Sequence, residues 1–460
     1  MNRILNRTFV VKFKDISKWV IPNNAFINIT PPKGWRLLKV RTFATQVLEK
    51  EIVKPNSEYK LVGVKWYGEG TFHRETVLGK DISARILTPL VKNAFLYNRL
   101  FAWKASFAIV PEEHTGFFVS NEFPQFVIDK KIILVRYFYL VITQKIFVDA
   151  VKRASQGSAA VSRNRFVEED FLELMIPVPP IEMQKKIINT WKRAQAQMFI
   201  QDKKNKDLKR KIHEVIFSNL EIFDAPINKT KYFAGFFKDL DKWSYQNIIL
   251  TQNLKSEKYP LVCLGQLENS YSLLTRGKSP RYDPESESII LNQKCNRWNK
   301  IDLSFAKKVS NNWLSKVDEK LLTRANDVII NSTGEGTLGR ATCIDSQHQR
   351  LFYDSHILNL RLDQKLLNSS YFAEIFNTSF IQKQIEVNKS AQSTKQTELG
   401  IQNLLRIQFP LPTLNRQIEL VNKINKMRVL IKTGQKNRDF IDEQYRKEIE
   451  LIVLGKKRVV

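Results

Sequence analysis

The stretch Phe171-Leu-Glu-Leu-Met-Ile-Pro-Val-Pro179 recurs as Leu404-Leu-Arg-Ile-Gln-Phe-Pro-Leu-Pro412, at an offset of 233 residues. The same offset places Gln184 on Gln417. Proline fixes its own φ and suits the first turn of a helix, but not a helix interior. Each Pro-x-Pro therefore predicts that a helix begins immediately after it.

Two further matches occur in the same order. Phe13-Lys-Asp-Ile-Ser-Lys-Trp19 recurs as Phe237-Lys-Asp-Leu-Asp-Lys-Trp243, and Leu37-Leu-Lys-Val40 recurs as Leu261-Val-Cys-Leu264, both at an offset of 224. One such match could arise by chance, whereas three matches in order indicate an internal duplication. Two copies of roughly 230 residues then fill the chain, the second about nine residues longer in its middle.

Each copy has a strand-rich first part and a helical second part. Apolar runs such as Tyr59–Val64 and Asp327–Ile330, punctuated by Gly, Pro and Asn, indicate strands. After each Pro-x-Pro, apolar residues recur every three to four positions for some 40 residues, which corresponds to a helix about 60 Å long. The sequence therefore predicts an α+β fold with two long helices.

A helix of this length usually needs a partner for its apolar stripe. We expect the two helices to pair with each other as an antiparallel coiled coil; the alternative is that each packs only on its own domain. The polar segment 201–206 could mark an interruption or a contact with another subunit. The residues expected in the helix packing are Ile188, Trp191, Met198, Leu208, Ile212, Val421, Ile424, Ile431, Ile441 and Ile449.

Composition narrows the functional class. Apolar residues make up 43% of the 460-residue chain, which excludes a largely disordered protein. Lys and Arg number 74 against 46 Asp and Glu, a net charge of +28, which favours a nucleic-acid binder over a small-molecule enzyme. Ribosome-associated and membrane-surface proteins are the alternatives.

The three cysteines, Cys263, Cys295 and Cys343, have no CxxC spacing and predict a reducing, cytoplasmic setting without disulfides. The N-terminal residues lack the apolar run of a signal peptide. The most apolar stretch, Lys131–Val151, contains charged residues and is too short to span a bilayer. We therefore expect no membrane association.

Several motifs point to catalysis or cofactors only superficially. Gly334-Glu-Gly-Thr-Leu-Gly339 matches a dinucleotide fingerprint, but the strand-like Arg340-Ala-Thr-Cys-Ile-Asp345 follows where a helix would be required. A tight hairpin that presents Asn331, Ser332, Thr333 and Arg340 on a rim is the better interpretation. The five histidines are dispersed, so the sequence predicts no catalytic residues, no metal site and no cofactor bound by this chain.

Basic residues interleaved with aromatics and amides recur in the strand-rich part of both copies. Lys and Arg neutralise phosphates, and Arg, Asn and Gln can contact base edges in the major groove. The long helix of the first copy is basic too and could face phosphates or an acidic partner. The candidate DNA-binding residues are Lys65, Tyr67, His73, Arg74, Arg85, Arg99, Lys104, Arg276, Lys278, Arg281, Tyr282, Lys294, Arg297, Trp298, Ser332, Thr333 and Arg340.

With these features the chain resembles the specificity (S) subunits of type I restriction-modification systems, over essentially its whole length. The resemblance is carried by Gln156-Gly-Ser158 followed by Ile176–Gln184, by Phe409–Gln417, and by Asp327–Arg340. Met183 and Arg416 stand where the family commonly has Glu. The glycine hairpin is absent from the first copy, which two unlike recognition units would explain.

The resemblance implies a non-enzymatic subunit with two target-recognition domains, each of which binds one half of a bipartite DNA site. Two modification subunits, which bind S-adenosylmethionine and methylate adenine, would be held by this scaffold. Restriction subunits that use ATP could join them in phage defence. The expected domains are target-recognition domain 1 (1–178), a central helix (179–222), target-recognition domain 2 (223–411) and a C-terminal helix (412–460).

A rigid helix pair would fix the distance between the two recognition domains, and hence the non-specific spacer of the DNA site, better than a flexible linker.

Three other functional classes stay open for this chain. The chain could be the recognition subunit of another multi-subunit modification or defence system, a stand-alone nucleic-acid enzyme, or a basic adaptor that never meets DNA.

Overall fold

The computed structural model describes residues 31–155, 165–223, 254–267, 269–388, 390–391 and 397–457. The repeated segments at 13–19 and 237–243, and Gln156-Gly-Ser158, lie outside the described residues. The chain divides into two compact units, one of residues 1–202 with 436–460 and one of residues 203–435. This division cuts both long helices, whereas the domain boundaries expected from the sequence keep each helix whole. Those expected boundaries stay a prediction.

The described residues in the globular part of the first unit form three sheets. A two-stranded sheet joins β1 (Arg36–Lys39) to β11 (Met175–Val178). A four-stranded sheet has the order β2 (Ala44–Gln46), β10 (Gln125–Ile128), β7 (Phe95–Tyr97), β8 (Phe107–Ile109). A five-stranded sheet has the order β3 (Glu51–Ile52), β6 (Ile86–Pro89), β9 (Phe118–Val119), β4 (Glu58–Val64), β5 (Thr71–Leu78). The helices are α1 (Val135–Ile142), α2 (Lys145–Ala154) and α3 (Glu168–Leu172).

The globular part of the second unit repeats this plan. A two-stranded sheet joins β12 (Leu261–Cys263) to β22 (Gln408–Pro410). The four-stranded sheet has the order β13 (Tyr271–Arg276), β19 (Ile357–Leu362), β16 (Asp327–Asn331), β17 (Ala341–Cys343). Smaller sheets contain β15 (Lys307–Lys308), β14 (Ile289–Leu291) and β18 (Phe352–Tyr353), and β20 (Ser390–Ala391) with β21 (Thr397–Glu398). The helices are α6 (Asn311–Leu314), α7 (Ser369–Phe376), α8 (Ser379–Asn388) and α9 (Ile401–Leu405).

The register of the strands confirms the duplication. Leu37 pairs with Pro177 in the first unit, and Leu261 pairs with Pro410 in the second, at the offsets of 224 and 233 seen in the sequence. The four-stranded sheets follow the same order of equivalent strands. A parallel pair also recurs, since β4 lies beside β9 in the first unit and β14 beside β18 in the second.

Equivalent buried hydrogen bonds fix the start of each long helix. The Gln184 side chain donates to the Pro179 carbonyl (2.9 Å) and accepts from the Leu134 N–H (2.7 Å). In the second unit the Gln417 side chain donates to the Pro412 carbonyl (2.9 Å) and accepts from the Asn368 N–H (2.8 Å). Each glutamine therefore ties the Pro-x-Pro and the helix entry to the loop that precedes α1 or α7.

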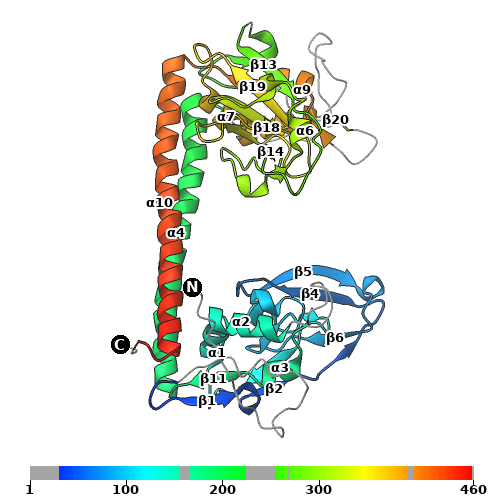
Figure 1. Ribbon diagram of the computed structural model, residues 1–460, viewed down its shortest axis with the longest axis vertical. Helices are drawn as coiled ribbons and strands as arrows, with labels where there is room; N and C mark the ends of the chain where they lie inside the picture. Colours follow the sequence, from blue (N-terminus) through cyan, green and yellow to red (C-terminus); the bar gives the residue numbers. More distant parts are fainter. Residues whose placement is uncertain are drawn as a thin grey trace, which may run out of the picture. The chain divides into compact units, whose positions relative to one another are not determined.

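The two long helices are α4 (Ile181–Leu220) and α10 (Leu414–Val453), each of 40 residues (Figure 1). In the first unit the start of α4 packs on the end of α10, where the Arg446 guanidinium lies 5.7 Å from the Trp191 ring centroid and Arg438 lies 3.8 Å from the Asp202 carboxylate. In the second unit the end of α4 shares a core with the start of α10. The helices therefore form the expected antiparallel coiled coil, and the alternative in which each packs only on its own domain is wrong.

Most of the residues expected in the helix packing lie in the buried clusters of the two units, and their assignment to the contact between the helices stays a prediction. Ile188, Trp191, Met198 and Ile449 are buried in the first unit, with Ile441 packed against them. Val421 and Ile424 are buried in the second unit, with Ile212 beside them, whereas Leu208 and Ile431 are half-buried. The polar segment 201–206 does not interrupt α4, which is continuous.

All three cysteines are free thiols, as the sequence predicts. Burial raises the pKa of Cys343 to about 11, which keeps this thiol protonated at neutral pH. Within the described ranges, every helix is too short or too polar to cross a membrane.

Candidate DNA interface

In the first unit an exposed tryptophan follows β4. Trp66 keeps 41% of its surface exposed, and the Lys104 ammonium lies 3.5 Å from its ring centroid. The neighbouring Tyr67 has a φ of +57°, a conformation uncommon outside glycine and often found at functional sites. Its N–H donates to the Lys104 carbonyl (2.8 Å), so the loop after β4 is held against the turn between β7 and β8. Together these contacts fix a cation over an exposed aromatic ring.

A similar cluster follows β14 in the second unit. Trp298 is 40% exposed with a φ of +55°, and the Arg340 guanidinium lies 5.6 Å from its ring centroid. The exposed Arg297 lies 4.9 Å from the ring centroid of Phe305. The buried Asn296 side chain donates to the carbonyls of Ile329 (3.2 Å) and Arg340 (2.8 Å), and so anchors the loop to β16 and β17.

The electrostatics of this second cluster favour an anion. Burial lowers the pKa of Arg340, and the nearby charge of Arg297 lowers this pKa further. Among the ion pairs of the described residues, neither guanidinium is paired with a carboxylate. Arg297 also interacts electrostatically with the Asp302 carboxylate. The repulsion between the two guanidiniums still falls when an anion binds between them.

More basic and aromatic side chains are exposed elsewhere on the second unit. Lys307 lies 4.4 Å from the ring centroid of the exposed Tyr282. The Thr333 hydroxyl is hydrogen-bonded to His356 Nδ1 (2.6 Å) in the loop after β16. The candidates Lys278, Arg281 and Lys294 are also exposed on this unit. These side chains are accessible to a ligand of the strand-rich part.

Other candidates are already engaged within the protein. Arg99 is ion-paired with Glu168, Arg276 with Glu398, and Arg74 with its neighbour Glu75. His73 and Arg85 are exposed in the first unit, with His73 Nε2 2.9 Å from the Thr76 hydroxyl, and Lys65 is exposed beside Trp66. Arg99, Arg276 and Arg74 would have to leave a carboxylate before contacting DNA, and their assignment to DNA contact stays a prediction.

The glycine motif forms the expected hairpin between β16 and β17. Gly334, Gly336 and Gly339 have φ values of +101°, +71° and +74°, which explains the glycines without a phosphate site. The expectation that Asn331 and Ser332 stand on a rim is wrong, because both side chains are fully buried. The Asn331 amide donates to the carbonyls of Gln293 and Thr337 and braces the turn. The rim therefore consists of Thr333 and Arg340, and contact of Ser332 with DNA stays a prediction.

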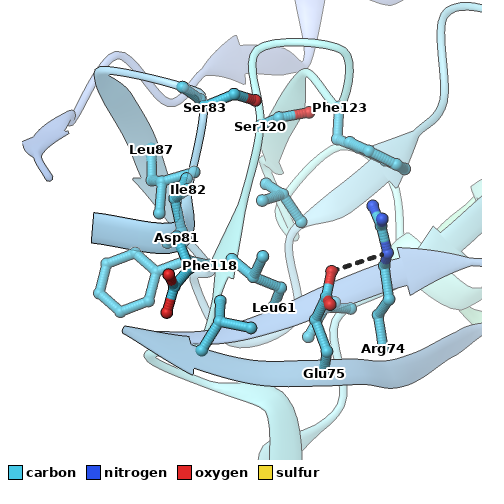
Figure 2. Close-up of a pocket in the computed structure, with 14 residues that line it drawn as sticks. Leu61, Arg74, Glu75, Asp81, Ile82, Ser83, Leu87, Phe118, Ser120 and Phe123 are labelled. Atoms are coloured by element: carbon cyan, nitrogen blue, oxygen red, sulfur yellow. Dashed lines mark ion pairs between the residues drawn. The ribbon is translucent and has the colours of Figure 1, made fainter. Parts of the chain in front are cut away.

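A cavity of about 230 Å³ lies against the five-stranded sheet of the first unit (Figure 2). Leu61, Phe118 and Phe123 form part of its wall, and the carboxylates of Glu75 and Asp81 line it as well. The candidate Arg74 also lines the cavity, where it is ion-paired with Glu75, so no unpaired cation is added to the basic surface here. In the described part of the chain, no group of three or more His, Cys, Asp or Glu side chains could hold a metal ion.

Reasoning from the sequence missed how the exposed rings and cations pair. Trp66, Lys307 and Phe305 were not among the candidates, although each is in contact with one of them. The recurrence of a tryptophan next to Lys65 and next to Arg297 is the sequence signal that could have identified the pair. The partners of these rings come from distant loops, which a local pattern does not identify.

No family model and no curated protein matches the chain. Among solved structures, a chain from work on complex assembly and conformational transition of the type I R-M system aligns with a TM-score of 0.53 at 14% identity, over 93% of this chain and 100% of that chain. The HsdS subunit from Thermoanaerobacter tengcongensis aligns with a TM-score of 0.39 at 12% identity, over 94% and 99%. The type I S subunit from M. genitalium aligns with a TM-score of 0.42 at 12% identity, over 94% and 98%.

The first of these likenesses spans the duplicated strand-rich parts and both long helices, the same features on which the resemblance in the sequence rests. At this level of identity the likeness concerns the fold. The chain therefore has the fold of a chain of the type I R-M system, in line with the resemblance seen in the sequence.

Proposed function

We propose that this chain is the DNA sequence-specificity subunit of a type I restriction-modification system. Each strand-rich part binds one half of a bipartite site, and the chain itself performs no chemistry. The observation that carries the proposal is the duplicated architecture on an antiparallel helix pair, with an exposed cation–tryptophan cluster in each unit.

The charge of the chain supports DNA as the ligand. A net charge of +28 attracts the phosphate backbone, and the cations at the two clusters are not neutralised by ion pairs among the described residues. Binding through phosphates releases counterions, so the affinity for duplex DNA falls steeply as salt rises.

The surface of the helices supports protein partners. Phe199 and Ile200 on α4 and Phe440 on α10 are large apolar side chains, all more than half exposed in the first unit. Val429 and Leu430 on α10 are similarly exposed in the second unit. Apolar groups gathered on an exposed helix favour docking of another protein. In our proposal two modification subunits dock here, supply S-adenosylmethionine and methylate adenine, and restriction subunits that use ATP can join.

The proposal is tested by a long-read map of methylated adenines in cells that carry this protein and in a deletion strain. We expect one bipartite motif to lose its methylation on deletion and to regain it on complementation. An unchanged map would contradict the proposal. A second assay incubates the purified chain alone with DNA and labelled S-adenosylmethionine, and transfer of the label would contradict the non-catalytic role.

A further inference from the structure

The two cation–tryptophan clusters occupy equivalent places in the two copies. Trp66 lies in the loop after β4, which runs parallel to β9, and Trp298 lies in the loop after β14, which runs parallel to β18. Leu61 pairs with Phe118 in the first case, and Ile290 pairs with Phe352 in the second. The residues Phe118 and Phe352 are themselves 234 apart, close to the offset of the duplication.

The cations also come from equivalent turns. Lys104 lies in the turn between β7 and β8, and Arg340 lies in the turn between β16 and β17. These strands hold the last two places in the same sheet order. In both units the loop that carries the tryptophan is tied to this hairpin by a backbone hydrogen bond, from Tyr67 to Lys104 and from Asn299 to Ala341.

The residue types at these places differ, although in both units a cation from the hairpin lies over the ring of an exposed tryptophan. The cation is a lysine in one copy and an arginine in the other, and it enters each turn at a different position. Two recognition units that bind different base sequences need not share a base contact. Both bind the same sugar–phosphate backbone, so they can share a contact with it. A shared cation on an exposed ring therefore fits a contact that is independent of sequence.

The donors left on Arg340 point the same way. One terminal nitrogen, Nη2, already donates to the Gly336 carbonyl (2.7 Å), and Nε is buried. Three N–H groups therefore remain on Nη1 and Nη2 of Arg340, at the tip of the guanidinium. They can donate to the oxygens of a phosphate, and Lys104 can contact a phosphate as a point charge.

We propose that Lys104 on Trp66 and Arg340 on Trp298 are a pair of equivalent phosphate clamps, one for each half of the DNA site. The inference rests on the proposed function and assigns these residues to the backbone, leaving sequence discrimination to other residues. Each indole ring acts as a positioning surface that holds its cation toward the phosphate.

The test measures binding of the full chain to a random-sequence duplex and to a duplex bearing its methylated motif, across a series of salt concentrations. We expect Lys104→Gln and Arg340→Gln each to lower affinity by the same factor on both duplexes. Each should reduce the slope of log affinity against log salt by about 0.9, the value for one lost phosphate contact. The methylated motif in cells should not change.

Conservative variants separate charge from geometry. Arg340→Lys and Lys104→Arg should keep the salt slope, because a phosphate needs only the charge, whereas a base contact by Arg340 would be lost in Arg340→Lys. Trp66→Ala should reproduce most of the loss of Lys104→Gln, and the double variant should add little more. Independent, additive losses would overturn the positioning role of the ring.

Exposed lysines away from the clusters, Lys130 in the first unit and Lys365 in the second, provide matched controls as Lys130→Gln and Lys365→Gln. A changed methylation motif in Arg340→Gln would overturn the assignment to phosphate. If Lys104→Gln and Arg340→Gln showed the same slope of log affinity against log salt as the control variants, the phosphate-clamp assignment would be wrong. The proposed function would be unaffected by that result. Failure of the unaltered chain to bind duplex DNA would instead overturn the proposed function itself.

Discussion

The buried side chains of Gln184 and Gln417 each bind three backbone groups, of which the carbonyl of Pro179 or Pro412 is buried. Besides the bonds at the helix entry, Gln184 donates to the Ile132 carbonyl (3.2 Å) and Gln417 donates to the Leu366 carbonyl (3.3 Å). A buried peptide group without a partner costs about 1–3 kcal/mol. At each site a single side chain therefore holds a helix, a Pro-x-Pro and a loop in one arrangement.

Replacing Gln417 by Met removes these bonds at nearly constant volume. We expect Gln417→Met to lower the free energy of unfolding by about 1–3 kcal/mol, because the buried Pro412 carbonyl loses its donor. Urea unfolding followed by circular dichroism measures the change. Gln444→Met, at an exposed position of α10, is the matched control. Equal stability of the two variants would contradict the assignment.

At the residue scale the sequence identified which residues are important more reliably than it identified what their side chains contact. The offset of 233 singled out Gln184 and Gln417, but not the backbone groups that they bind, because the loops before α1 and α7 lie about 50 residues earlier. Arg297, Trp298 and Arg340 were candidates, and the structure brings them together. Ser332 was a candidate too, but a hydroxyl in a polar-looking loop gave no sign that packing would bury it.

At the scale of elements, an ion pair fastens α10 to α7 in the second unit. Arg428 donates two hydrogen bonds to Glu374, at 2.9 and 2.6 Å, and the Asn299 amide donates a third at 3.1 Å. Burial raises the pKa of Glu374, and the Arg428 charge opposes this rise. The carboxylate therefore depends on Arg428 to remain charged within the core.

We expect Arg428→Met to destabilise the protein by about 3–5 kcal/mol, because it leaves a buried carboxylate without its counter-charge. The double variant Arg428→Met with Glu374→Met should recover much of this loss. In the single variant the pKa of Glu374 should lie further above its unfolded value, so the folded form should gain stability as pH falls from the folded pKa to the unfolded pKa.

Urea unfolding of the single and double variants at several pH values checks this expectation. Glu374→Met alone serves as the control, since it removes the buried charge and leaves only a half-exposed arginine unpaired. A loss in Arg428→Met that does not depend on pH would show that the carboxylate is not the cause.

Elements were predictable where a pattern of burial recurs along the chain. The period of three to four residues identified both long helices, and the strand-like run after Gly339 identified the β16–β17 hairpin. The pairing of β4 with β9, and of β14 with β18, was not predictable, because both are parallel contacts between strands separated by long connections.

For the whole molecule, the proposed role of the helix pair is to set the spacer of the DNA site. A matched insertion of seven residues, placed after Asp202 in α4 and after Gln435 in α10, keeps the apolar stripes in phase. Seven helical residues add about 10 Å, which corresponds to about three base pairs. We expect the methylated motif to keep both half-sites and to gain a longer spacer.

Mapping of methylated adenines in cells that carry this variant measures the spacer directly. A variant with alanine substitutions at the same junctions, but no change in length, controls for disruption of the helices. An unchanged spacer with methylation retained would contradict the role of the helix pair as a ruler.

The sequence alone determined the duplication, the strand-rich parts, and the two long helices with their Pro-x-Pro entries. These follow from periodicity and from the backbone limits of proline and glycine, which act over a few neighbouring residues. Only the tertiary structure decided which cation lies over which tryptophan, which arginines are occupied by carboxylates, and that Ser332 is buried. Those contacts join residues about 40 to 120 positions apart, and their partners are set by how loops meet when the sheets pack.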